Sequence, residues 1–298
     1  MRRTGAWAGV LLCVAASGCL DRAGRKAVAG RPGADPVRAR SFSPTGFGGL
    51  PAVGADGLYV ESVLLERPVG DPFLDRDLWA AGRSPLPGET DAILAENGLR
   101  VLVLGGNLPP GFQKMLGSEA ETVNPHALTF ANRKDAVVPT AGPTDPCEYD
   151  VRPDLAVGRT KVKLRQARCG VLVRPERAAD GRVKVWCEPQ VQHGDRTDWF
   201  RPTADGTEFV KQGEVPVERY PGLGFEVLLG VNDYLLIGWP AETDATLGAA
   251  LFGVEANGRP RQRVLVVRAG WGGSRASDLP PIPRHRGRPS IAAEVANW

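Results

Sequence analysis

The sequence predicts an α+β protein, with a small α/β module at residues 56–120 and a mainly antiparallel β domain at residues 121–271. Before residue 120, short apolar runs alternate with helix signals, whereas alternating apolar and polar residues dominate after it. Glycine (37) and proline (26) are too few for a wholly disordered chain, but they predict many turns and short strands. A chain of 298 residues can bury a proper core in one or two domains.

The first 18 residues have the three parts of a secretory leader. Arg2 and Arg3 form a positive start, an apolar run covers residues 6–16, and small residues precede Cys19. The run is shorter than the roughly 20 residues that span a bilayer. The segment resembles the lipobox of bacterial lipoproteins, which implies cleavage before Cys19 and a diacylglyceryl group on its sulfur. The implied location is the cell envelope, on the outer membrane or a membrane that faces the periplasm; ordinary secretion is the alternative.

Two segments have the composition of linkers. Residues 19–55 are rich in Gly, Pro, Ala and Arg without a sustained period, which predicts a flexible tether, and residues 272–298 predict a disordered tail. The formal net charge is +3, and loss of Arg2 and Arg3 with the leader leaves +1 (3 − 2). Because positive charge concentrates in the tether and the tail, the middle is mildly acidic, which argues against nucleic acid as a partner. The basic tether either contacts anionic lipid headgroups or is simply solvated.

Within the α/β module, strands and helices alternate. Residues 59–65 are expected to form a strand that ends near Pro68, and residues 99–104 a buried strand. Residues 89–96 are expected to form a short helix that Asn97-Gly98 terminates, and Pro109-Pro110 opens another helix.

The β domain contains one clear hairpin, around a loop at residues 175–181. Pairing residues symmetrically about Ala178 sets three pairs opposite one another on one face: Val173 with Val183, Val171 with Val185, and Cys169 with Cys187. Other strands are expected at residues 147–151, 247–254 and 263–267. A second hairpin is expected from residues 225–229 and 234–239, with a tight turn at residues 231–233.

Three cysteines remain in the β domain: Cys147, Cys169 and Cys187. An exported protein meets an oxidising environment, so a disulfide is expected more than a metal site. The predicted hairpin sets Cys169 opposite Cys187, while Cys147 on the preceding strand is an equal candidate for pairing with Cys169. The sequence does not decide between these two pairings. The alternative to a disulfide is that all three cysteines are small buried apolar residues.

No catalytic or cofactor motif stands out. Gly105-Gly106 is followed within four residues by two prolines, which lack the amide donors that cradle phosphate. Solvated side chains are the ordinary explanation for two polar clusters, which contain His193, Asp195 and Asp198 in one case and Asp71, Asp75 and Asp77 in the other. Four aromatic residues are candidates for binding a glycan or a partner: Trp186, Trp199, Phe200 and Trp239. We therefore expect a protein that is not an enzyme and holds no cofactor or metal.

Four segments occur in a fixed order between residues 168 and 268. They are GVLVRP with DGRV (170–175 and 180–183), residues 224–238, TLGAALF (246–252) and RVLVV (263–267). Their order resembles the core of the secretin family, the outer-membrane ring proteins of type II and type III secretion and of type IV pilus systems. The resemblance implies a ring component or an accessory of such an envelope apparatus.

The expected function is that of a non-catalytic exported lipoprotein in an envelope secretion or pilus assembly. Strands with free edges can add neighbours and build rings, so the expected partners are further copies or secretion and pilus proteins, beside the membrane that holds the lipid. The alternative is a monomeric, lipid-tethered binding module for an unknown ligand, which predicts a β domain with covered edges. A hydrolase would need a cleft with converging acid, base or nucleophile groups.

Overall fold

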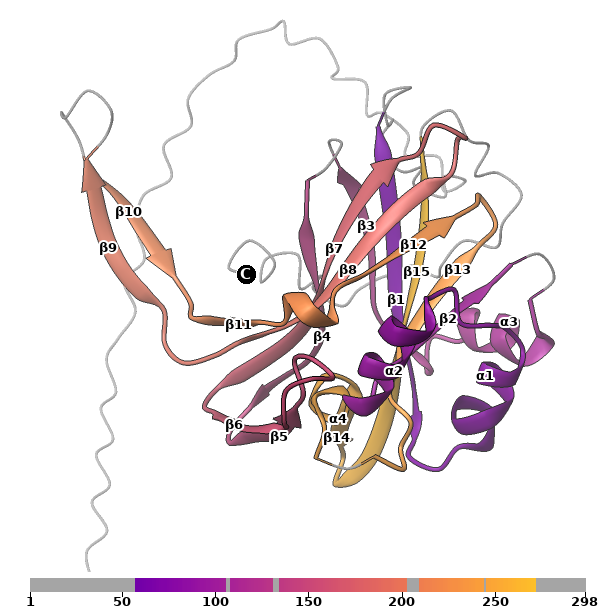
Figure 1. Ribbon diagram of the computed structural model, residues 1–298, viewed down its shortest axis with the longest axis horizontal. Helices are drawn as coiled ribbons and strands as arrows, with labels where there is room; N and C mark the ends of the chain where they lie inside the picture. The colour runs from indigo at the N-terminus through magenta and orange to yellow at the C-terminus, as the bar shows by residue number, and fades with distance from the viewer. Residues whose placement is uncertain (1–56, 106–107, 131–133, 203–208, 244, 272–298) are drawn as a thin grey trace, which may run out of the picture. The chain divides into compact units, whose positions relative to one another are not determined.

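A central antiparallel sheet organises the fold in the computed structural model (Figure 1). Its strands lie in the order β2-β13-β15-β1-β3, with β14 paired to β15 beside this path. Their bounds are β1 Leu58–Pro68, β2 Arg100–Leu104, β3 Thr122–Phe130, β13 Tyr234–Gly238, β14 Gly253–Ala256 and β15 Arg259–Trp271. The structure describes residues 57–105, 108–130, 134–202, 209–243 and 245–271.

The central sheet is buried on both faces because β13 and β15 contain continuous apolar runs rather than alternating ones. Short helical segments pack on one face: η1 (Phe73–Asp77), α1 (Leu78–Ala80) and α3 (Pro110–Leu116). There the ring of Phe112 meets the ring of Tyr234 edge to face, with centroids 5.8 Å apart. Phe112 is fully buried, and burial of a side chain of this size stabilises a fold by roughly 1.5–3 kcal/mol.

A second sheet packs on the other face of the central sheet. It contains β4 (Ala136–Thr144), β7 (Ala167–Arg177) and β8 (Val183–Gln192), while β11 (Val217–Arg219) and β12 (Phe225–Leu229) pair with the two ends of β8. The two sheets share one apolar core, which includes Val171, Val173, Val185 and Val227 from the second sheet and Leu58, Val60, Leu265 and Val267 from the central sheet. The layers are therefore helix, sheet and sheet.

Smaller elements complete the described chain. They are α2 (Gly88–Glu96), α4 (Leu247–Phe252), β5 (Cys147–Val151), β6 (Thr160–Leu164), β9 (Thr197–Pro202), β10 (Phe209–Glu214) and η2 (Pro221–Leu223). α2, α4 and β5 add buried side chains to the core between the sheets, including those of Leu94, Leu251 and Tyr149. β5 pairs with β6, and β9 with β10, in separate two-stranded sheets.

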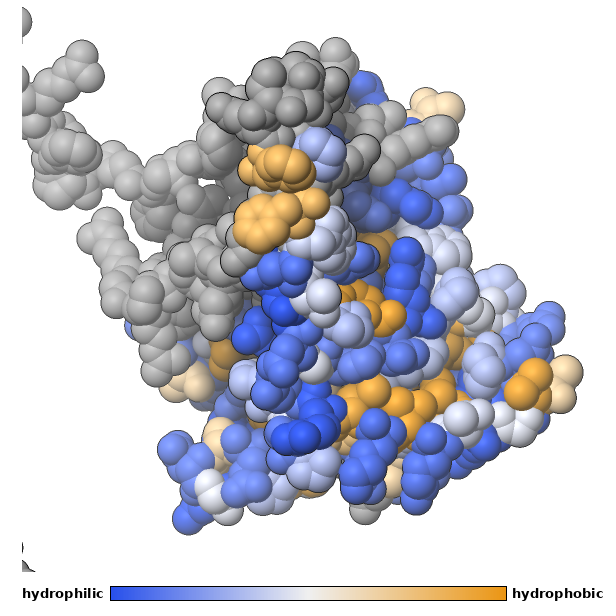
Figure 2. All heavy atoms as spheres, turned by 90° about the vertical axis from the view of Figure 1, so that its left-hand side faces the viewer, coloured by the Kyte–Doolittle hydropathy of each residue, from blue (hydrophilic) through white to orange (hydrophobic). Residues whose placement is uncertain are grey.

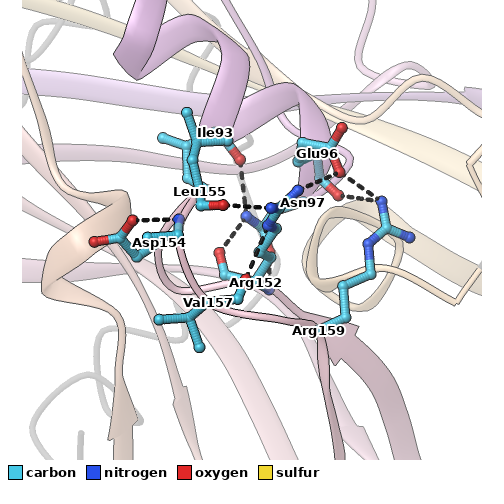
Figure 3. Close-up of polar contacts among 9 residues, drawn as sticks. Ile93, Glu96, Asn97, Arg152, Asp154, Leu155, Val157 and Arg159 are labelled. Atoms are coloured by element: carbon cyan, nitrogen blue, oxygen red, sulfur yellow. Dashed lines mark hydrogen bonds and ion pairs between the residues drawn. The ribbon is translucent and has the colours of Figure 1, made fainter.

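A buried junction joins the end of α2 to the end of β5 (Figure 3), and α4 contacts it as well. The side-chain amide of Asn97 donates to the carbonyl oxygens of Ile93 and Arg152, both at 2.8 Å, and its Oδ1 accepts from the backbone N–H of Arg152 at 2.7 Å. The backbone N–H of Gly248 donates to the carbonyl oxygen of Asn97 at 2.9 Å. A Cβ at Gly248 would lie 1.9 Å from the carbonyl oxygen of Gly98, so only glycine fits this approach of two backbones.

The predicted fold class is confirmed: the protein is mainly antiparallel β with a small helical part. The expected helices and the strand between them appear as α2, α3 and β2. The expected division near residue 120 does not coincide with a boundary between sheets, because β1 and β2 pair with β15 and β13. The leader, tether and tail expected at residues 1–18, 19–55 and 272–298 lie outside the described residues.

The β7–β8 hairpin exists, but its predicted register is wrong. Val173 lies opposite Cys187 rather than Val183, and Cys169 lies opposite Val191 rather than Cys187. β7 runs on through Arg177, three residues into the predicted loop, while β8 begins at Val183, so the pairing is centred on Asp180 rather than on Ala178. Because the side-chain period of a strand is two, this shift leaves the same side chains facing the core.

Pro175 explains the error, because it does not end β7. Pro175 lies opposite Val185 in β8. The pairing of β7 with β4 ends before it, at Val173, so the missing N–H of Pro175 costs no hydrogen bond to β4. The tip of the hairpin contacts the end of β15. The indole N–H of Trp271 donates to the carbonyl oxygen of Gly181 at 2.9 Å, and the guanidinium of Arg177 lies 4.3 Å from the indole centroid.

Two further predictions are wrong in the same part of the chain. β12 and β13 follow one another around a tight turn, but they do not form a hairpin, because β12 pairs with β8 and β13 with β15 and β2. The segment 247–254, expected to be a strand, begins as helix α4. The hydroxyl of Thr246 accepts from the backbone N–H of Ala249 and caps this helix.

Candidate functional site

A two-stranded ribbon continues from the second sheet. The pairing of β8 with β11 ends at Gln192 and Val217, and the backbone N–H of His193 donates to the carbonyl oxygen of Pro216 at 3.0 Å. The pairing of β9 with β10 then runs from Thr197 opposite Glu214 to Pro202 opposite Phe209. These pairings make one ribbon whose far end is β9 and β10 (Figure 1).

Three aromatic side chains of this ribbon are exposed to solvent. The exposed fractions are 41% for Trp199, 67% for Phe200 and 69% for Phe209. The register sets Phe200 and Phe209 on one face of the ribbon and Trp199 on the other. We call these three residues the aromatic ribbon. Figure 2 faces the side on which the ribbon lies in Figure 1, and hydrophobic residues reach the surface there.

The four aromatic residues singled out in the sequence divide into two groups. Trp239 is buried, and its indole N–H donates to the carbonyl oxygen of Thr243 at 2.8 Å. Trp186 is half-buried, with the guanidinium of Arg174 5.8 Å from its ring centroid. Only the other two, in β9, are exposed. Sequence reasoning missed Phe209, although it starts an apolar pair that follows a turn-rich polar stretch, which is a strand signal.

The polar cluster around His193 has local partners. The Nε2 of His193 lies 3.4 Å from the Oε1 of Glu218, and the Nε of Arg196 donates to the Oδ1 of Asp198 at 3.0 Å. The structure does not join His193 to an acid–base pair with Asp195 and Asp198 in any described contact.

The three aspartates near residue 73 lie at or beside η1 and make local contacts within this segment. The carboxylate of Asp71 accepts from the backbone N–H groups of Phe73 and Leu74 at 3.1 and 3.2 Å, and Asp77 pairs with Arg76 at 3.0 Å. Across the described residues, no group of three His, Cys, Asp or Glu side chains is placed to hold a metal ion. The residues that the structure describes also contain no helix that is both long and apolar enough to cross a membrane.

The three cysteines of the β domain are buried free thiols. The structure brings together Cys147 and Cys169, whose thiols contact each other, and it leaves Cys187 apart, between Val173 and Phe225. This contact lowers the pKa of the Cys147 thiol, and the same contact together with burial raises the pKa of the Cys169 thiol. Burial alone raises the pKa of the Cys187 thiol. Cys19 lies outside the described residues.

Two buried tyrosines lie beside this thiol pair. The hydroxyls of Tyr149 and Tyr220 share a hydrogen bond of 2.7 Å, and the two rings meet edge to face with centroids 6.4 Å apart. Burial raises the pKa of Tyr149 above its ordinary value, and the bond to Tyr220 raises it further. Burial also raises the pKa of Tyr220, from 10.0 to about 12.

These tyrosines predict a loss of stability at alkaline pH. Because the folded protein holds the pKa of Tyr220 at about 12, the unfolded chain, with a pKa of 10.0, releases this proton at lower pH. The stabilisation is complete below pH 10 and declines as the pH rises toward 12. Urea unfolding midpoints at about pH 9 and about pH 11 should therefore decline more steeply for the wild type than for Tyr220→Phe. Parallel declines in the two proteins would contradict this assignment.

No family model matches the sequence, and no curated protein or solved structure matches it. The fold and the site define a layered β protein with an exposed aromatic ribbon and a buried thiol pair.

Proposed function

We propose that this protein is a non-catalytic exported lipoprotein, anchored in the cell envelope through an acylated Cys19, that contributes to an envelope secretion or pilus assembly as a secretin-like component or accessory. The observation that carries the proposal is the aromatic ribbon. Exposed side chains of Phe200 and Phe209, both about two thirds exposed or more, lie on one face of a two-stranded element. Aromatic residues are enriched at the centres of protein interfaces.

The energy available from this surface is sufficient for a specific contact. Covering one large apolar side chain contributes about 2 kcal/mol, and the aromatic ribbon has three. A ribbon built on paired strands also holds these side chains in a fixed alternation. A partner that covers the face with Phe200 and Phe209 would thus gain most of its affinity from two adjacent rings.

One outer strand of each sheet is less suited to adding neighbours. β3 contains Pro125, and β4 contains Pro139 and Pro143. Proline lacks the N–H that a new strand would pair with, and it is one of the devices that protect sheet edges. Assembly is therefore expected to use the aromatic ribbon rather than extension of the sheets at β3 or β4. These prolines also favour the second candidate, a monomeric lipid-tethered module that binds its ligand through the same ribbon.

The proposal is tested by the double variant Phe200→Ser/Phe209→Ser, with Val157→Ser as the matched control. Val157 is 49% exposed and lies between β5 and β6, away from the ribbon in sequence. After mild detergent extraction, native mass spectrometry should show an oligomer for the wild type and for the control. The double variant should be monomeric, with an unchanged circular dichroism spectrum.

Three other outcomes would each contradict a different part of the proposal. A wild type that is monomeric at every concentration would contradict assembly and favour the monomeric binding module. An oligomer that persists in the double variant would exclude the ribbon as the contact surface. Loss of the oligomer in Val157→Ser as well would show that the effect is not specific to the ribbon.

A further inference from the structure

We propose that Cys147 and Cys169 form a disulfide in the exported protein and that Cys187 remains a buried thiol. The proposal rests on export to an oxidising compartment, which is part of the proposed function. It assigns a covalent link between β5 and β7 and resolves a pairing that the sequence leaves open.

The sheet register excludes Cys187 as the partner of Cys169. Cys169 lies opposite Val191, and Cys187 is four residues away from Val191 along β8. At about 3.4 Å per residue this separation is roughly 13 Å, whereas a disulfide requires Cα atoms within about 7 Å. Cys187 lies in the interior of its sheet, opposite Val173 and Phe225, so neither strand beside it presents a thiol.

The chain bends between the residues that pair β4 with β7 and those that pair β5 with β6, and this bend lets Cys147 approach Cys169. β4 pairs with β7 as far as Thr144 opposite Ala167, and the same ladder resumes with Cys147 opposite Leu164 in the β5–β6 sheet. Two register shifts interrupt the pairing of β4 with β7 on either side of Ala141. Bulges of this kind bend a strand.

The bend is also visible in the backbone. Gly142 and Gln166 lie near it, with φ values of +111° and +51°. The side chains of Cys147, Leu164, Ala167 and Cys169 all belong to the core between the sheets. At this bend the thiol of Cys147 contacts the thiol of Cys169, and among the described cysteines this is the pair that the fold brings together.

The oxidation proceeds by thiol–disulfide exchange with a donor disulfide, either of an oxidoreductase or of oxidised glutathione. The thiolate of Cys147 attacks one donor sulfur, the donor S–S bond breaks, and the other donor sulfur leaves as a thiolate. The thiolate of Cys169 then attacks the sulfur of Cys147 and releases the second donor thiolate. Two electrons and two protons pass to the donor, which becomes two thiols. Since both cysteines are more than 95% buried, the exchange takes place during folding, before β5 packs against β7.

Peptide mapping can identify this bond, because the three cysteines fall in different tryptic peptides. Cleavage after Lys and Arg, except before Pro, places Cys147 in residues 135–159, Cys169 in residues 169–177 and Cys187 in residues 185–196. The exported full chain is denatured with iodoacetamide present, digested without reductant and analysed by mass spectrometry. Peptide 135–159 should be linked to peptide 169–177, and Cys187 should be alkylated. Two alkylated thiols at Cys147 and Cys169, or a link to Cys187, would overturn the proposal.

A second arm separates failure of the disulfide from failure of export. The full chain is refolded from urea with oxidised glutathione, and the same map is recorded. If the link forms there but is missing from protein made in cells, the disulfide stands and the proposed export is wrong. If no link forms on refolding, the disulfide proposal is wrong whatever the location of the protein.

Matched variants complete the test. Cys187→Ala should keep the linked peptide, whereas Cys147→Ser should leave Cys169 fully alkylated after refolding. Reduction of the wild type should lower the thermal midpoint by about 8 °C, because the bond closes a loop of moderate length, and should leave Cys147→Ser unchanged. Equal midpoints for the oxidised and reduced wild type would show that the two thiols are not linked in the folded protein.

Discussion

Gly248→Ala is expected to lower the free energy of unfolding by about 3 kcal/mol, although alanine is the better helix former. The new Cβ would lie 1.9 Å from the carbonyl oxygen of Gly98 and 2.5 Å from its carbonyl carbon. Both are backbone atoms that no rotamer change can move. The hydrogen bond from the backbone N–H of Gly248 to Asn97 would have to lengthen from 2.9 Å as the two backbones separate. Urea unfolding followed by circular dichroism measures the loss.

Gly88→Ala is the matched control for this substitution. Gly88 begins helix α2, and no heavy atom lies within 4 Å of a Cβ built at this position. The same chemical change should therefore leave stability unchanged or raise it by up to about 1 kcal/mol. Equal unfolding midpoints for Gly248→Ala and Gly88→Ala would show that the junction relaxes without cost.

Cys19→Ala is expected to transfer the protein from the membrane fraction to the soluble envelope fraction. A diacylglyceryl group needs a sulfur, and each buried CH₂ of an acyl chain contributes about 0.8 kcal/mol to membrane binding. The basic residues of the tether give only about 1 kcal/mol each near an anionic surface. Loss of the acyl chains should thus remove most of the affinity. Fractionation with immunoblotting, together with metabolic labelling by palmitate, measures both the location and the acylation.

Cys13→Ala is the natural control, because Cys13 belongs to the segment expected to be removed as the leader. Its membrane fraction and palmitate label should match those of the wild type. Unchanged membrane partitioning of Cys19→Ala would contradict the lipoprotein assignment, and a soluble Cys13→Ala protein would show that the leader itself had been damaged.

Local patterns predicted the elements whose signals are local. The Asn97-Gly98 stop marks the end of α2, and Pro110 opens α3. The buried faces of β7 and β8 also followed from alternation alone. Their register did not, because a displacement by an even number of residues preserves the alternation. Pro175 suggested that the strand ends there. It does not, because β4 pairs with β7 only as far as Val173, so β7 can contain a proline beyond that residue without losing a hydrogen bond to β4.

Long-range partners decided the rest. The turn between β12 and β13 has the same local sequence whether the strands pair with each other or separate into two sheets, and only β8 and β15 determine which occurs. The run at residues 247–252 is apolar and short, so its period cannot distinguish a strand from a helix. The cap at Thr246 and the contact with Gly98 favour the helix.

The candidate site was predictable only in part for the same reason. Trp199 and Trp239 were both candidates for binding a glycan or a partner, yet one is exposed and the other is enclosed by the turn at Thr243. The sequence shows that Cys169 has two candidate partners. The choice between them depends on a bend of the β4–β7 ladder that no local motif announces.

The pairing of β1 with β15 determines when this chain can fold. Leu58 lies opposite Trp271 and Pro68 opposite Arg261, so the first and last described strands are neighbours in the middle of the central sheet. Such a sheet cannot be completed until the chain has been synthesised beyond Trp271, because its closing contact spans about 200 residues. If the chain is exported as proposed, this late closure would leave the segment that enters the translocation channel first without its sheet partner until the last strand follows.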